Sequence, residues 1–113
     1  MTDRFIWNNN FLNVEHRYQG MYDLTGFQRD LLYITAGLDD PHGLAIQDEL
    51  GDYYEEEIHH GRLYPNLDTL VEKGLVEKSQ RDKRTNEYSL TRRGEREIQA
   101  RADWEAEYIT HDS

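Results

Sequence analysis

GRLYPNLDTLVEKGLVEK, residues 61–78, decides the fold of this chain. Pro65 is tolerated in the first turn of a helix, where the amide has no partner within the helix, and Gly74 is a common helix end. We therefore expect a helix that starts near Gly61 and ends at Gly74. Its apolar residues recur on one face, at Leu63, Leu67, Leu70 and Val71.

A polar stripe without acidic side chains runs along the same helix, at Arg62, Asn66, Thr69 and Lys73. The stripe is either a solvated face or a surface that reads base edges in the major groove. Arg62 suits guanine O6 and N7, and Asn66 suits adenine N6 and N7. We favour the second interpretation and predict that Arg62, Asn66 and Thr69 read bases, while Lys73 contacts the DNA backbone.

Two short strands follow, at residues 75–80 and 86–90, with Val76, Tyr88 and Leu90 at inward positions. They flank RDKRT, which gives the predicted hairpin a basic tip at Arg81, Lys83 and Arg84. An ordinary charged turn would explain these residues too. The number of bases in the tip favours a wing that meets DNA phosphates or the minor groove.

Helices are expected before and after this unit. Thr25 and Gln28 form a capping box for a first helix, whose apolar face is Phe27, Leu31, Ile34 and Leu38. A second helix over residues 43–54 has Leu44, Ile46, Leu50 and Tyr53 or Tyr54 as its expected buried residues, with Gly51 at an end or bend. Thr91 caps a last helix over residues 92–109, whose apolar stripe is Ile98, Ala102, Ala106 and Ile109.

This order of elements predicts a mainly α fold with a small β-hairpin: a winged helix-turn-helix. We expect an N-terminal arm at residues 1–23, the winged helix-turn-helix at 24–90, and a C-terminal dimerisation helix and tail at 91–113. The aromatic arm packs either on the core or on a second subunit, and the sequence leaves this open.

The stretches LTGFQRDLLYITAGL, HGLAIQDEL, GRLYPNLDTLVEKGLVEK and NEYSLTRRGEREI resemble the PadR-like winged-helix transcription regulators over about residues 24–99. The resemblance implies a homodimer whose last helix and N-terminal residues form the interface, with the third helices in successive major grooves. The predicted interface residues are Trp7, Phe11, Ile98, Ala102, Trp104, Tyr108 and Ile109. Within the family, the acidic composition and aromatic arm are similar to a haloarchaeal regulator of the response to reactive oxygen species.

Further contacts to the DNA backbone are predicted from position. Arg29, Arg92 and Arg93 stand at helix starts, and His60 lies beside the proposed reading helix. For Tyr64 two interpretations stand side by side. Its hydroxyl either touches a phosphate or the ring packs beside Leu67.

The charge distribution supports a local DNA-binding surface. The chain of 113 residues has a net charge of −10, yet residues 60–94 carry 8 basic and 5 acidic side chains. The acidic excess elsewhere is either an adaptation to a concentrated-salt cytoplasm or an ordinary acidic surface. In a halophile, salt cations would shield or bridge the protein and the DNA. The rival function is a winged-helix protein-interaction module without specific DNA binding.

No enzymatic arrangement is recognisable, because there is no cysteine, no glycine-rich phosphate loop and no HExxH or GxSxG motif. No apolar run is long enough to span a bilayer and the start lacks a signal-peptide pattern, so we expect a cytoplasmic protein. Glu56 with His60, or Glu55 with His59, would hold a divalent metal if helical. The surrounding acids favour a solvated loop, and we expect neither a metal nor another cofactor.

Overall fold

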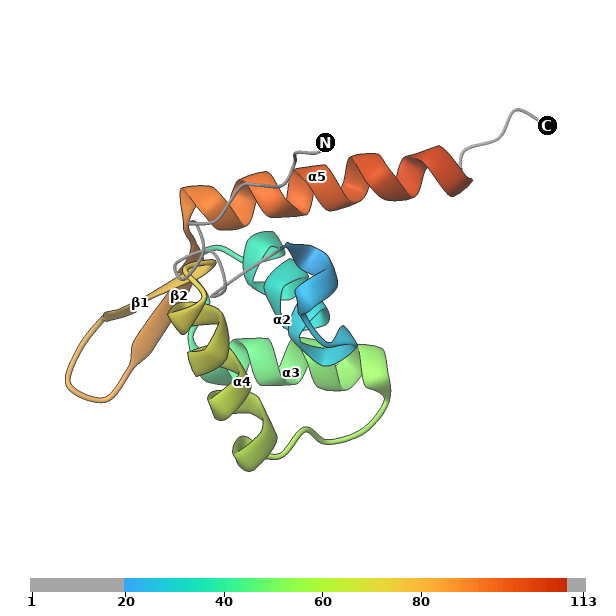
Figure 1. The fold of residues 1–113 in the computed structure, drawn as a ribbon. Coiled ribbons are helices and arrows are strands. Elements are labelled where there is room, and N and C mark those ends of the chain that lie inside the picture. The colour runs from blue at the N-terminus through green and yellow to red at the C-terminus, as the bar shows by residue number, and fades with distance from the viewer. Residues whose placement is uncertain (1–19, 110–113) are drawn as a thin grey trace.

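The computed structural model describes residues 20–109 of the chain. In order, these form η2 (Met21–Asp23), α2 (Gly26–Gly37), α3 (Gly43–Tyr54), α4 (His60–Glu72), β1 (Val76–Gln80), β2 (Asn86–Leu90) and α5 (Arg92–Ile109). Three helices followed by a hairpin and a longer helix form a winged helix-turn-helix, so the predicted fold class is confirmed (Figure 1). Trp7 and Phe11 lie outside the described residues.

The core lies where α2, α3 and α4 meet. Its centre consists of side chains with no solvent exposure: Leu31, Leu32, Ile46, Leu50, Leu63, Leu67, Leu70 and Leu75. Each fully buried leucine contributes about 1.5–3 kcal/mol through the apolar area it removes from water. The leucine face predicted for residues 61–74 therefore anchors α4 and turns its remaining faces outward.

The capping box at the start of α2 is present as predicted. Thr25 Oγ1 accepts from the Gln28 amide at 3.1 Å, and Gln28 Oε1 accepts from the Thr25 amide at 3.1 Å. Phe27 and Leu31 are buried, as expected, whereas Ile34 and Leu38 are only half-buried.

The prediction for α3 was wrong at Leu44, which is 54% exposed, and right at Ile46 and Leu50, which are buried. Of the two alternatives at the end of the helix, Tyr53 is 75% exposed and Tyr54 is half-buried. Leu44 lies two positions before Ile46 and so on the side of the helix away from the core. Tyr53 stands in the last turn, where the neighbouring Tyr54 takes the inner position and meets the Phe27 ring edge-on at 6.0 Å.

Of the two predictions for Gly51, an end or a bend of α3, the end is wrong, because Gly51 lies within the helix. The helix ends at Tyr54, and Glu55 follows in the left-handed conformation with φ 59°. A Cβ at Gly51 would stand 3.0 Å from the Glu56 carbonyl oxygen, so the glycine lets the chain fold back closely over α3. This return leads directly into α4.

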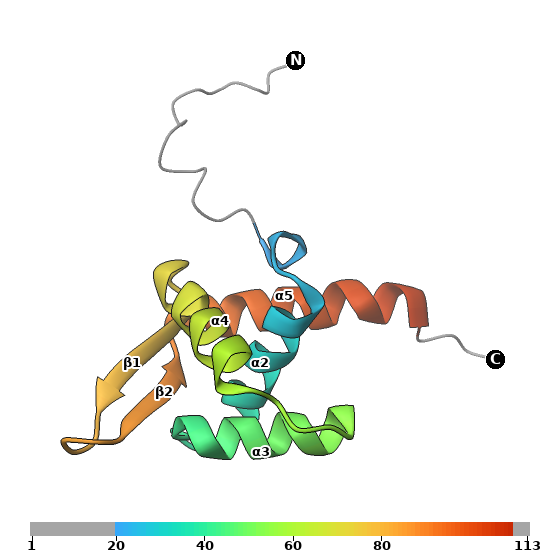
Figure 2. The same ribbon diagram turned by 90° about the horizontal axis from the view of Figure 1, so that it is seen from below.

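The hairpin pairs β1 and β2 antiparallel, with Val76 opposite Leu90 and Lys78 opposite Tyr88. Thr91 caps α5, because its hydroxyl accepts from the Gly94 amide at 3.0 Å and donates to the Gly74 carbonyl at 2.7 Å. The hairpin projects to one side of the helices, and the second half of α5 extends beyond them (Figures 1 and 2). Within residues 20–109, no helix is both long and apolar enough to cross a bilayer.

Candidate nucleic-acid interface

The polar stripe of α4 lies along the flank that faces η2 and the start of α2. At its first residue, the Arg62 guanidinium carbon stands 3.9 Å from the centroid of the Phe27 ring of α2. This cation–π contact aligns the planar guanidinium while the residue stays exposed.

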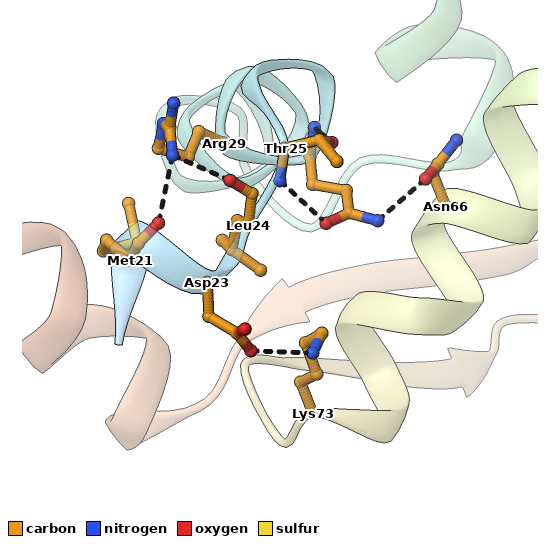
Figure 3. Close-up of polar contacts among 8 residues, drawn as sticks. Met21, Asp23, Leu24, Thr25, Arg29, Asn66 and Lys73 are labelled. Carbon is orange, nitrogen blue, oxygen red and sulfur yellow. Dashed lines mark hydrogen bonds and ion pairs between the residues drawn. The ribbon is translucent and has the colours of Figure 1, made fainter. Parts of the chain in front are cut away.

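Asn66 is held at both ends of its side-chain amide. Gln28 Nε2 donates to Asn66 Oδ1 at 2.9 Å (Figure 3). Asn66 Nδ2 donates to the Arg62 carbonyl at 2.7 Å. Gln28 therefore has two roles, since its Oε1 caps α2 and its Nε2 orients Asn66. The sequence predicted only the capping role. The only sequence feature that indicates the second role is that a capping-box glutamine, unlike a glutamate, also has a side-chain NH2 group.

Thr69 and Lys73 complete the stripe. The Thr69 hydroxyl donates to the Pro65 carbonyl at 3.0 Å. Lys73 Nζ pairs with Asp23 Oδ2 at 3.0 Å, and this pair ties the end of α4 to η2 (Figure 3). The pairing of Lys73 with Asp23 was not predicted from the sequence, because the two residues lie 50 positions apart in the chain.

Arg29 is engaged within the protein. Its guanidinium Nη1 donates to the carbonyls of Met21 at 3.1 Å and Leu24 at 2.8 Å (Figure 3). These bonds hold η2 against the start of α2. The structure thus gives Arg29 a structural role within the protein, in addition to its predicted contact with the DNA backbone.

The wing tip is shaped by an acidic residue. Asp82 Oδ1 accepts from the amides of Arg84 and Thr85, each at 2.9 Å, and these backbone bonds hold the pKa of the Asp82 carboxyl below its usual range. Arg81 pairs with Glu87 at 2.9 Å across the hairpin. Lys83 and Arg84 are exposed and make no ion pair within residues 20–109, so they are the tip's available cations.

His60 and Tyr64 occupy the other flank of α4, toward α3 and the wing. Their rings stack with centroids 6.0 Å apart. The Tyr64 hydroxyl lies directly against Gly43, where a Cβ would collide with it. The packing of Tyr64 is therefore against the start of α3, and both flanks of α4 carry predicted DNA-contacting residues.

The predicted contact of Arg92 and Arg93 with the DNA backbone stays a prediction. They begin α5, and the Arg93 guanidinium lies beside Gly74 at the far end of α4. In Figure 1 the start of α5 stands away from both the wing tip and the first turn of α4.

The acidic stretch before α4 is a loop. Because α3 ends at Tyr54, Glu55–His59 and Glu56–His60 lack helical spacing. Across residues 20–109, no three carboxylate or imidazole side chains are grouped closely enough to hold a metal ion.

A helix pair, a third helix with polar flanks and a basic-tipped hairpin define a winged-helix DNA-binding protein. The chain belongs to the transcriptional regulator PadR-like family, whose sequence profile matches residues 31–100. The resemblance noted in the sequence is thereby confirmed.

Solved structures of RosR from H. salinarum are similar over most of the chain. One, grown from NaBr, is 52% identical with a TM-score of 0.76 and covers 80% of this chain and 82% of its own. A complex structure designated hsRosR-S1 is 52% identical with a TM-score of 0.77 and covers 80% of each chain. The winged-helix DNA-binding protein F93 from STIV is 15% identical with a TM-score of 0.63, covers 80% of this chain and 99% of its own, and shares the fold. Among curated proteins no match was found.

Proposed function

We propose that this PadR-family regulator binds a palindromic operator as a homodimer. It reads bases with α4 and contacts the DNA backbone with its wing. The observation that carries the proposal is the acid-free stripe of α4, exposed at Arg62 and half-buried at Asn66, Thr69 and Lys73, beside a basic-tipped hairpin. Arg62, Asn66 and Thr69 are the base-reading residues. Lys73, Tyr64, His60 and the wing residues Arg81, Lys83 and Arg84 contact phosphates.

The dimer is proposed to form through α5. Trp104, Tyr108 and Ile109 are 49%, 62% and 71% exposed at its far end, where the helix extends past the body. Large apolar side chains gathered on one exposed surface typically mark an interface. A second copy would cover them, together with Ile98 and Ala102 on the same helix, and would set the two α4 helices about one turn of DNA apart.

We further propose that the regulator acts in the cytoplasm of a halophile, in the response to oxidative stress. The net charge of −10 suits a concentrated-salt interior, where the Debye length falls to about 3 Å and repulsion from DNA is screened. The 52% identity with RosR supports the physiological assignment. Salt cations at the protein–DNA interface would bridge the remaining acidic groups to phosphates.

Footprinting on genomic fragments at several KCl concentrations tests the function. We expect a protected palindrome whose half-sites lie about one helical turn, or a multiple, apart. Arg62→Ala should relax the preference for one base pair in each half-site at a cost of about 1–3 kcal/mol. Arg96→Ala, an exposed change on α5, is the matched control and should leave the footprint intact.

Two results would contradict the proposal. Lack of protection at every salt concentration would favour the protein-interaction module. An unchanged base preference in Arg62→Ala would show that the polar stripe of α4 does not read bases.

A further inference from the structure

A cleft of about 380 Å³ lies between the start of α3, the outer flank of α4 and the wing. Its walls include His42, Gly43, Tyr64, Arg84, Asn86 and Tyr88. No acidic side chain lines it, although the chain as a whole carries a net charge of −10. The cleft is therefore a place on this protein that an anion can approach.

The start of α3 presents an unpaired amide to the cleft. The first helical amides cannot be satisfied within a helix, and the His42 side chain at the cap position makes no capping bond. The Gly43 amide faces the Asn86 carbonyl across the bridge that pairs His42 with Glu87. Within residues 20–109, the Leu44 amide has no backbone acceptor, whereas the amides of Ala45 and Ile46 bond the His42 carbonyl. These amides stand at the positive end of the 12-residue helix.

Tyr88 supplies an independent observation that points to a ligand. The residue is 2% exposed and lines the cleft, yet within residues 20–109 nothing hydrogen-bonds its hydroxyl. Buried hydroxyls in folded proteins nearly always have a partner. Burial raises the pKa of the Tyr88 hydroxyl, with Asp68 and Tyr64 adding to the effect, so the group stays protonated and remains a donor.

Tyr64 and Arg84 complete the donor set from two other elements. The Tyr64 hydroxyl is seated on Gly43, where any larger residue would displace it. The Arg84 amide is fixed by Asp82, while its exposed guanidinium makes no ion pair within residues 20–109. Two phenols, a helix amide and a guanidinium match the oxygens of a phosphate group.

We propose that this cleft binds one phosphodiester group of the DNA backbone per subunit. The Tyr88 and Tyr64 hydroxyls and the Leu44 amide donate to its oxygens, and Arg84 supplies the opposing charge. The inference rests on the proposed function, because α4 and the wing are the elements that approach the duplex. Through the cleft, the wing, α3 and α4 would all contact the same phosphate.

The test uses the full chain and a footprinted operator in which single phosphates are replaced, one at a time, by uncharged methylphosphonates. Wild-type affinity should fall at one such position in each half-site. Tyr88→Phe removes only the hydroxyl and should weaken binding to the unmodified operator about tenfold. On the operator that carries the methylphosphonate at the sensitive position, Tyr88→Phe should bind almost as tightly as wild type does. Tyr33→Phe, on α2 and away from the cleft, is the matched control and should behave like wild type.

Arg84→Ala provides a second variant if Tyr88→Phe folds poorly, because residue 84 is exposed. It should show the same loss of sensitivity at that phosphate and a shallower dependence of affinity on salt. If, for both variants, the loss of affinity from the substitution adds to the loss from the methylphosphonate at every position, the cleft assignment is overturned. Operator binding by the protein would still stand. Failure of wild type to bind the operator would instead overturn the proposed function.

Titration of the DNA-free protein with inorganic phosphate distinguishes the remaining source of the ligand. Saturable phosphate binding that needs Tyr88, combined with no methylphosphonate-sensitive position, would assign the cleft to a free anion and overturn the proposal. Weak or absent phosphate binding together with one sensitive position per half-site would support it.

Discussion

Replacing Gln28 should change base preference although Gln28 is expected to touch no base. Its Nε2 orients the Asn66 amide from 2.9 Å, and Asn66 needs a fixed amide to pair with adenine N6 and N7 at once. The informative substitution is Gln28→Glu. A glutamate keeps the oxygen that caps α2, but it cannot donate to Asn66 Oδ1.

The expected magnitude follows from the bond that is lost. A neutral hydrogen bond in half-buried surroundings has a net worth of about 0.5–1.5 kcal/mol, which is a two- to tenfold change in an equilibrium constant. We therefore expect the ratio of operator to non-specific affinity to fall by about two- to tenfold. Taking the ratio removes the general repulsion that a new carboxylate adds, because that repulsion acts on both DNAs. The free energy of unfolding should change little, since the capping box persists.

Fluorescence anisotropy with the operator, with operators changed at one base pair and with non-specific DNA would measure this ratio. Asn66→Ala and the double variant complete a double-mutant cycle. If Gln28 acts through Asn66, Gln28→Glu will have no further effect on specificity in the Asn66→Ala background. Equal losses of specificity in the two backgrounds would refute the positioning role, and an unchanged ratio in Gln28→Glu would do so directly.

Two further outcomes are expected. Trp104→Ala should shift the chain from dimer toward monomer in sedimentation at micromolar concentration, whereas Gln99→Ala on the same helix should not; unchanged assembly in Trp104→Ala would argue against α5 as the interface. Burial, and then the bond to Asp30, raises the pKa of Tyr54 from its usual 10 to about 12. A raised pKa stabilises the fold below pH 10 and the stabilisation is lost toward pH 12, so Tyr54→Phe should lose less unfolding free energy than wild type across that range. Parallel losses in the two proteins would contradict this.

The helices and the hairpin followed from local patterns in the sequence. The capping box, the leucine face of α4 and the basic turn each act over a few residues, and each lies where it was expected. The error at Leu44 was of another kind. Periodicity marked Leu44 as a buried residue of α3, but which apolar residues become buried depends on where α2 and α4 pack.

The site was less accessible to sequence reasoning. The stripe of α4 could be listed, whereas its partners could not, because Asp23 and Gln28 lie 50 and 38 positions away from Lys73 and Asn66. Tyr88 was expected only as an inward strand residue. Its unpaired hydroxyl becomes meaningful once the fold brings β2 beside the start of α3.

The two ends of α3 explain how so acidic a chain can orient itself on DNA. Its first residues border the acid-free cleft, while its last turn and the loop beyond line a groove with Asp48, Asp52, Glu55, Glu56 and Glu57. The helix dipole has the same sense, positive at the cleft and negative at the groove. In the proposed complex, an approaching duplex would be attracted at the wing side and repelled at the groove side, which favours one docking orientation at low salt even though the net charge is repulsive. At molar salt the repulsion is screened within about 3 Å, while hydrogen bonds made in contact persist. We therefore expect the charge pattern to favour one orientation at low salt, and the contacts of α4, the cleft and the wing to supply the affinity.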